Sequence, residues 1–179
     1  LSAAANRGRG IFNGPVGCNV CHAGNLFTDN TFRDIGVRPS NEDTGRFQVT
    51  GNTNNIGQFR VPSLRNVGRR TSFFHNGQLT TLNQVVAFYN RGGDFPNNPN
   101  VPNNLIRPLG LNNGQQNDLV AFLQALTDPR VTAESGPFDR PTLYMESNRV
   151  PLITGTGRAG SGAATPTIRA ISPPLAGNP

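Results

Sequence analysis

One pentapeptide, residues 18 to 22, constrains this chain more than any other feature. It reads Cys18-Asn19-Val20-Cys21-His22 and holds both cysteines and one of the two histidines. Two thiols in a C-x-x-C-H arrangement, with the imidazole directly after the second, are the attachment signature of a c-type haem. In that chemistry Cys18 and Cys21 carry the thioethers to the haem vinyl groups, and His22 supplies the proximal iron ligand. The sequence therefore predicts one covalently bound haem c.

Two other uses of these cysteines have less support. A structural zinc site needs four protein ligands, and only His75 remains to supply another imidazole. A redox-active disulfide of C-x-x-C type is expected beside a βαβ unit, and the flanking sequence shows no such pattern. The spacing therefore favours haem c over both alternatives.

The composition is that of a loop-rich chain with a small core. Of the 179 residues only 35% are hydrophobic, Gly and Pro number 21 and 15, and Trp is absent. A chain of this length suits one domain with an extension. A buried macrocycle would supply apolar material that the side chains lack, which agrees with the haem prediction.

The basic charge does not indicate a nucleic-acid groove. The formal net charge is +6, and all 16 basic residues are arginines. These arginines are scattered and form no dense run, and two haem propionates would offset part of their charge. We therefore predict no nucleic-acid binding, and interpret the charge as a docking surface for a redox partner.

The N-terminal sequence bears on where the protein works. No run of about 18 apolar residues occurs, so no transmembrane segment is predicted. No signal peptide is visible from Leu1 onward, although covalent haem attachment takes place outside the cytoplasmic membrane. We therefore expect an exported protein, periplasmic or extracellular, whose leader is not present in this chain.

The first predicted helix covers residues 2–12, with Ser2 as its cap. Gly8 lies on the same face as the apolar residues of this helix. Because glycine costs a helix about 1 kcal/mol relative to alanine, Gly8 suggests a close crossing with a second helix.

Two later segments carry strong helix signals. Residues 82–91 follow a capping box that begins at Thr81, and their apolar face includes Tyr89. A final helix is predicted over residues 114–127, with Asn113 as its N-cap. Together with the first helix, these segments predict a small helical haem domain.

The remaining sequence is mostly loop. Residues 32–37 and 58–61 are candidate short strands, joined by a polar, turn-rich connection. We predict an all-α domain over residues 1–147, with long loops and at most a short β-hairpin. Residues 148–179 are rich in Gly and Pro and are predicted to be an extended tail or linker.

Several motifs recur in a fixed order around the pentapeptide. They are Gly8 to Phe12, Val61 to Val67 (VPSLRNV), Phe73 to Gly77 (FFHNG), Thr81-Leu82 through Tyr89 to Gly93, and Leu119 to Asp128. Over about residues 3–145 the chain resembles the C-terminal haem domain of the bacterial dihaem cytochrome c peroxidase and MauG superfamily. The resemblance implies a class I cytochrome c-like fold and a second haem domain or redox partner protein.

The resemblance also implies a function. The chain would be the electron-transfer domain of a peroxidase-like or MauG-like dihaem oxidoreductase, relaying electrons to or from a second haem in another domain or subunit. Only one attachment motif is present, so this chain by itself is not the two-haem enzyme. The alternative is a stand-alone monohaem cytochrome, or a cytochrome subunit of a larger complex, which would be an electron carrier and not an enzyme.

The resemblance places the distal iron ligand at position 89. Peroxidase members carry methionine there and MauG-like members carry tyrosine, and this chain has Tyr89. A phenolate would stabilise ferric iron and lower the reduction potential. Three alternatives stay open. Tyr89 is an ordinary core aromatic, which would leave a five-coordinate haem able to bind peroxide or a gas. Otherwise Met145, the only methionine, or His75 is the second axial ligand.

Further cofactor-binding candidates lie in the loops. Arg60 and Arg65 either pair with haem propionates or are solvated surface charges, and His75 is expected to be hydrogen-bonded near the haem or a domain interface. The resemblance further implies a calcium site at the interface, with backbone carbonyls of Arg70 and Ser72 as ligands. Both positions depart from the family's usual Thr and Pro, and the other half of that site is not in this chain.

Overall fold

The structure is a computed structural model that describes residues 1–135, 137, 143–146 and 168–171. Contacts divide the chain into two units, Leu1–Asp128 and Pro129–Pro179. The predicted boundary between residues 147 and 148 falls inside the second unit, at residues outside the described ones. The division into residues 1–147 and 148–179 therefore stays a prediction.

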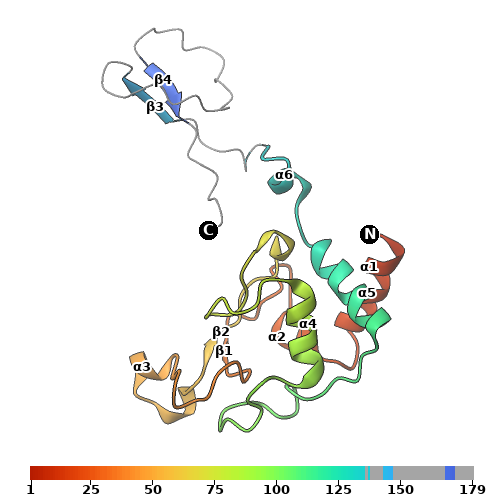
Figure 1. Ribbon diagram of the computed structural model, residues 1–179, viewed down its shortest axis with the longest axis vertical. Coiled ribbons are helices and arrows are strands. Elements are labelled where there is room, and N and C mark those ends of the chain that lie inside the picture. Colours follow the sequence, from red (N-terminus) through yellow and green to blue (C-terminus); the bar gives the residue numbers. More distant parts are fainter. Residues whose placement is uncertain (136, 138–142, 147–167, 172–179) are drawn as a thin grey trace. The chain divides into compact units, whose positions relative to one another are not determined.

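The first unit consists mainly of helices with one small sheet (Figure 1). In chain order its elements are α1 (Ala3–Phe12), α2 (Cys18–Cys21), β1 (Phe32–Arg33), α3 (Phe47–Thr50), the 3-10 helix η1 (Thr53–Asn55), β2 (Phe59–Arg60), the 3-10 helix η2 (Val67–Arg69), α4 (Leu82–Arg91) and α5 (Asn113–Gln124). Helices α1 and α5 lie side by side, and α4 also contacts α5.

Helix α1 begins as predicted and crosses α5 closely. The Ser2 hydroxyl accepts a hydrogen bond from the Ala5 N–H at 3.1 Å, which caps the helix. A Cβ atom added at Gly8 would lie 1.9 Å from the carbonyl oxygen of Asp118, so only glycine fits between the two backbones. Arg7 forms an ion pair with the Asp118 carboxylate at 2.7 Å beside this contact. The predicted close crossing at Gly8 is confirmed.

The capping box of α4 is also confirmed, whereas the N-cap of α5 lies one residue earlier than predicted. Asn112, not Asn113, is the N-cap, and its side chain accepts from the Gln115 N–H at 2.9 Å. The Gln115 side chain accepts from the Asn112 N–H in return. Gln116, which lies three residues after Asn113, instead donates its side-chain amide to the Leu111 carbonyl. The reciprocal bonds of a capping box are therefore those of Asn112 with Gln115.

Helix α5 also ends before the predicted residue 127. Its last residue is Gln124, after which the chain tightens into turns with three-residue spacing. The Leu126 N–H, for example, donates to the Leu123 carbonyl at 3.3 Å. Such tightening is common in the last turn of a helix.

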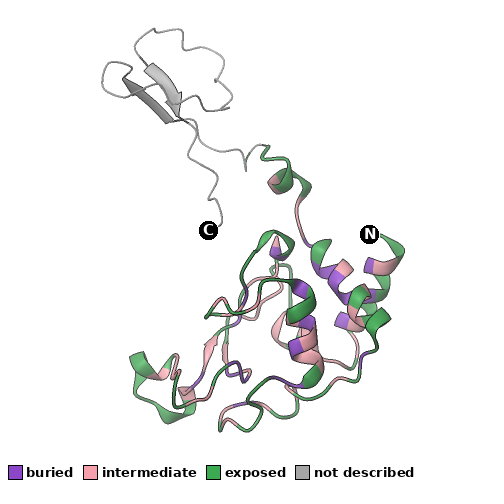
Figure 2. Ribbon diagram, in the orientation of Figure 1, coloured by how far each residue is buried: buried purple, intermediate pink, exposed green. Residues whose placement is uncertain are grey.

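The apolar core of this unit lies between α1, α4 and α5, whose facing sides are buried (Figure 2). Its buried members are Phe12, Val67, Phe73, Leu82, Val86, Leu111, Leu119, Val120, Phe122, Leu123 and Leu126. Apolar residues at helical spacing on these helices supply most of this core, and Val67, Phe73 and Leu111 join it from η2 and the loops.

Both candidate strands form, although each is short. β1 pairs with β2 in antiparallel register, with Phe32 opposite Arg60 and Arg33 opposite Phe59. Helices therefore predominate in the first unit, but the small sheet means that the all-α description is not confirmed.

The second unit contains α6 (Pro129–Thr132) and a further antiparallel pair, β3 (Leu143–Glu146) with β4 (Ile168–Ile171). Met145, the alternative iron ligand, belongs to β3. Within the described part of the chain, none of the helices has both the length and the apolar character needed to cross a membrane.

Candidate cofactor site

The first unit holds a cavity of about 470 Å³, a size typical of cofactor sites. Its wall is mainly apolar and includes side chains of α1, α4 and α5 together with the connecting loops. Cys18, Cys21, His22 and Tyr89 all line this cavity. The fold thus brings the pentapeptide and the buried face of α4 to one space.

The His22 ring is held in the tautomer that a metal ligand needs. Its Nδ1 lies 2.9 Å from the carbonyl oxygen of Phe27. Because a carbonyl can only accept, Nδ1 donates the proton and Nε2 keeps its lone pair. Burial lowers the pKa of His22, against the opposing effect of the nearby Phe27 and Pro62 carbonyls and the Asp29 charge. The ring is therefore neutral at pH 7, which is the ligating form.

Phe27, which orients His22, has no signal in the sequence. Its φ angle is +53°, uncommon for a residue other than glycine, and this conformation points its carbonyl at the His22 ring. The Phe27 ring packs against Phe12 and Phe122, with centroid separations of 6.0 and 6.2 Å. Tertiary packing of the side chain thus stabilises the backbone conformation that holds the histidine.

The two cysteines are free thiols on partly buried positions. Burial raises the pKa of Cys18 to about 11. Burial also raises the pKa of Cys21, although the charge and hydrogen bond of Arg33 oppose this. Both sulfurs therefore keep their protons at neutral pH and are available for thioether formation.

Tyr89 offers an oxygen atom to the same cavity. Its ring makes edge contacts with Phe88 and Phe74, at centroid separations of 5.3 and 6.3 Å. Tyr89 is half-buried, and none of the described residues forms a hydrogen bond with its hydroxyl. Burial strongly raises the pKa of Tyr89, and the nearby Cys18 and Cys21 sulfurs add to this. The hydroxyl therefore keeps its proton at neutral pH.

The structure brings only one of the two predicted arginines to the cavity. Arg60 lines it, and its guanidinium donates to the Asn30 side chain. Arg65 is exposed and is not part of the cavity wall: its Nε donates to the Asn25 carbonyl at 2.7 Å, and its guanidinium lies over the Phe27 ring. An interaction of Arg65 with a cofactor in this cavity is therefore not supported by the geometry.

Arg33, by contrast, lines the cavity and was missed. Its Nη2 pairs with Asp29 at 3.2 Å, whereas its Nε is buried without a hydrogen-bond partner among the described residues. An arginine in a two-residue strand gives no local sign of facing inward. The pairing of β1 with β2 places it there.

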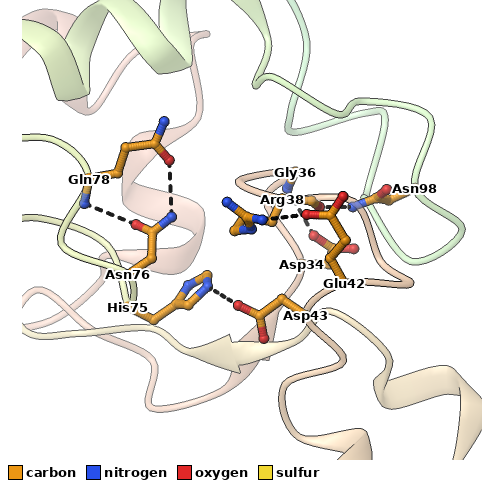
Figure 3. Close-up of polar contacts among 9 residues, drawn as sticks. All are labelled: Asp34, Gly36, Arg38, Glu42, Asp43, His75, Asn76, Gln78 and Asn98. Atoms are coloured by element: carbon orange, nitrogen blue, oxygen red, sulfur yellow. Dashed lines mark hydrogen bonds and ion pairs between the residues drawn. The ribbon is translucent and has the colours of Figure 1, made fainter.

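His75 is hydrogen-bonded on the cavity wall. Its Nε2 lies 2.6 Å from the Asp43 carboxylate (Figure 3), and its ring stacks on Phe59 with centroids 3.5 Å apart. Both members of the hydrogen-bonded pair line the cavity, with side chains 22% and 27% exposed. Asp43 was not singled out in the sequence, because it lies in a polar loop far from His75 along the chain.

Asp34 is a second acidic residue of the wall that sequence analysis missed. It is only 3% exposed. Its Oδ1 accepts from the Gly36 N–H at 2.9 Å, whereas its Oδ2 is buried with no hydrogen-bond partner among the described residues. A buried carboxylate with one unpartnered oxygen is costly, which suggests that the group is not purely structural.

Replacing Asp34 by asparagine is expected to stabilise the protein more at neutral than at acid pH. Burial raises the pKa of Asp34, although the Gly36 N–H, the Asn98 side chain and the His75 charge oppose this. When folding raises the pKa of a carboxyl group, the contribution of that group to stability is fully present at pH values below its pKa in the unfolded state. This contribution to stability is lost as the pH rises through the pKa of the folded state. Asparagine keeps the acceptor for Gly36 and has no charge to bury.

Urea unfolding of the wild type and D34N at about pH 3 and pH 7 measures this difference. The stability of D34N relative to the wild type should be greater at pH 7. The same relative stability at both pH values would show that the Asp34 pKa is not raised.

The predicted calcium ligands, Arg70 and Ser72, also lie on the cavity wall. Among the residues that the structure describes, no three His, Cys, Asp or Glu side chains form a group that could hold a metal ion. A calcium site built from backbone carbonyls thus stays a prediction.

Comparison with curated proteins shows which proteins this chain is similar to. No protein-family model matches the chain. It is 36% identical over 163 residues to the cytochrome-c peroxidase IdrP1 of Denitromonas iodatirespirans. The match covers 73% of this chain and 43% of the relative. It is 35% identical over 127 residues to the methylamine utilization protein MauG of Methylorubrum extorquens, covering 70% of this chain and 35% of the relative. The chain thus spans less than half the length of these relatives.

Solved structures agree with this similarity. A MauG-like protein associated with microbial copper homeostasis superposes with a TM-score of 0.69 at 25% identity, covering 78% of this chain and 47% of that one. The diheme peroxidase BthA from Burkholderia thailandensis superposes with a TM-score of 0.62 at 29% identity, covering 76% and 45%. The fold is therefore that of these cytochrome c-like proteins.

Proposed function

Because the chain belongs to the dihaem cytochrome c peroxidase and MauG superfamily, we propose that it is a haem c domain that relays electrons. The second haem would lie in another domain or subunit, and this domain would correspond to the C-terminal one of the family. The observation that carries the proposal is that Cys18, Cys21, His22 and Tyr89 line the same cavity. The protein would work in the periplasm as part of a peroxidase-like or MauG-like oxidoreductase.

The residues of the cavity fit a haem group. Bound haem c supplies one-electron redox chemistry. Cys18 and Cys21 would hold it covalently, and the Nε2 lone pair of His22 would ligate the iron from the proximal side. The Phe27 carbonyl keeps that lone pair available by accepting a hydrogen bond from Nδ1–H. The mainly apolar wall suits the haem macrocycle.

We assign the distal position to Tyr89. Its hydroxyl shares the cavity with His22 and has no protein hydrogen-bond partner among the described residues. Met145 belongs to the other unit of the chain, on β3. A phenolate ligand would lower the reduction potential relative to a thioether, because it stabilises the ferric charge.

Replacing Tyr89 by phenylalanine tests this assignment. The ferric Y89F protein should lose the low-spin electron paramagnetic resonance signal and show a high-spin signal, because one axial position is then open. Its reduced form should bind carbon monoxide, which the wild type should not. Tyr144→Phe, at the only other tyrosine, is the control and should leave the spectra unchanged. Identical spectra for the wild type and Y89F would show that Tyr89 is not a ligand.

Peroxide reactivity tests the relay role. The reduced wild-type domain alone should be stable to hydrogen peroxide, because both axial positions are filled, and its absorbance should persist in a stopped-flow experiment. Y89F should be reoxidised much faster, since peroxide can reach the open position. Rapid catalytic turnover of peroxide by the wild-type domain alone would contradict the relay proposal and indicate chemistry at this haem.

A further inference from the structure

Asp34 stands out because it is buried on the cavity wall with an unused oxygen. Its Oδ2 lies against Gly57, where an added Cβ would come within 2.5 Å of it. Gly57 has a φ of +74°, so a side chain there would be strained as well as crowded. The backbone at Gly57 therefore covers Oδ2 without donating a hydrogen bond to it.

The His75–Asp43 pair lies on the same wall (Figure 3). The His75 ring is fixed from two sides, by the hydrogen bond to Asp43 at 2.6 Å and by stacking on Phe59. Its charge acts on Asp34 and favours the ionised carboxylate. The His75 ring is thus held at a fixed position near a buried acid.

No described arginine forms an ion pair with Asp34. The nearby arginine–carboxylate pairs are Arg33–Asp29, Arg38–Glu42 and Arg91–Asp94. The other charged residues of the cavity wall are Arg60, Arg70, Asp43 and His75. Asp34 consequently has no direct cationic partner to keep it ionised.

We propose that Asp34 is a proton-binding site that takes up one proton when the haem in this cavity is reduced, and that the His75–Asp43 pair tunes it. The inference rests on the proposed function, because it requires haem in the cavity. An external one-electron reductant supplies the electron, and solvent supplies the proton. The only bond formed is the O–H bond on Asp34, so the net charge of the buried region stays constant.

The physical reason is electrostatic. An added electron makes the cavity more negative by one charge, and a carboxylate in a poorly solvated wall responds strongly to that change. Asp34 begins in an environment that already disfavours its ionised form, so the added negative charge increases its affinity for a proton further. A solvated carboxylate such as Glu42, whose side chain is 49% exposed, would respond far less.

Spectroelectrochemical titration of the haem-loaded protein between about pH 4 and pH 9 tests the proposal. Uptake of one proton per electron lowers the midpoint potential by about 59 mV per pH unit. The wild type should approach this slope in the pH range where Asp34 titrates, and D34N should lose the slope there. Glu42→Gln, which removes a carboxylate of the same loop, is the control and should keep the slope.

His75→Gln gives a second, independent readout. It removes the positive charge that favours the ionised form of Asp34. The pH range over which the midpoint potential changes should therefore move to higher pH, while the slope within that range stays the same. A flat wild-type profile, or a slope that persists unchanged in D34N, would overturn the proposal. A protein that forms no haem absorption band would instead contradict the proposed function, so the two failures are distinguishable.

Discussion

A variant with both Cys18 and Cys21 replaced by alanine is expected to release all of its haem into acid acetone, whereas the wild type retains it. The two thiols are the only cysteines of the chain, so no other sulfur can form a thioether. Both line the cavity with His22, whose position does not depend on the sulfurs because Phe27 holds its ring. The double variant can therefore still bind haem through His22, but only without a covalent bond.

Extraction followed by absorbance of the solvent and protein phases measures the covalent fraction. Val20→Ala is a matched control within the same pentapeptide, because Val20 is 51% exposed and lies outside the cavity wall. It should retain all of its haem. Covalent haem in the double variant would refute the attachment chemistry assigned to this site.

The second large effect is expected at the crossing of α1 and α5. Gly8→Ala should destabilise the protein by about 3 kcal/mol or more, because the new methyl group would overlap the backbone oxygen of Asp118 and the helices would have to separate. This separation would also pull Phe12 away from its contact with Phe122 in the core. A loss of this size is a large share of the stability of a small domain.

Gly10→Ala in the same helix provides the matched comparison. No atom lies within 4 Å of a Cβ at Gly10, so the substitution should raise stability by about 0.5–1 kcal/mol through helix propensity alone. Chemical denaturation followed by far-ultraviolet circular dichroism measures both variants. Equal effects of the two substitutions would show that α1 does not pack against α5 as described.

Features set by neighbouring residues could be predicted from the sequence. The pentapeptide places two thiols and an imidazole within one short turn, so its chemistry follows from spacing alone. The caps at Ser2 and Thr81 depend on a side chain and an N–H three residues away, which is also local. The close crossing at Gly8 was predictable as well, because a glycine on the apolar face of a helix leaves room for a second backbone. The α5 cap was misplaced by one residue because Asn112 and Asn113 both have a glutamine three residues on.

Features that depend on distant residues needed the tertiary structure. The sequence does not show that Phe27 turns its carbonyl toward His22, because packing on α1 and α5 stabilises that backbone conformation. Nor does it distinguish Arg33, which lines the cavity, from Arg65, which does not. A loop side chain takes its direction from whatever packs against it, and those contacts come from other parts of the chain.

The sequence by itself determined that a haem c is expected, which residues would attach it, and which helices surround it. Tertiary structure alone decided that Arg33 and Asp34 lie on the wall of the cavity lined by Tyr89 and His22, and that Asp34 is buried there. The reason is that covalent and capping chemistry act over a few consecutive residues. Burial and electrostatic environment arise only when segments far apart in the chain enclose the same space.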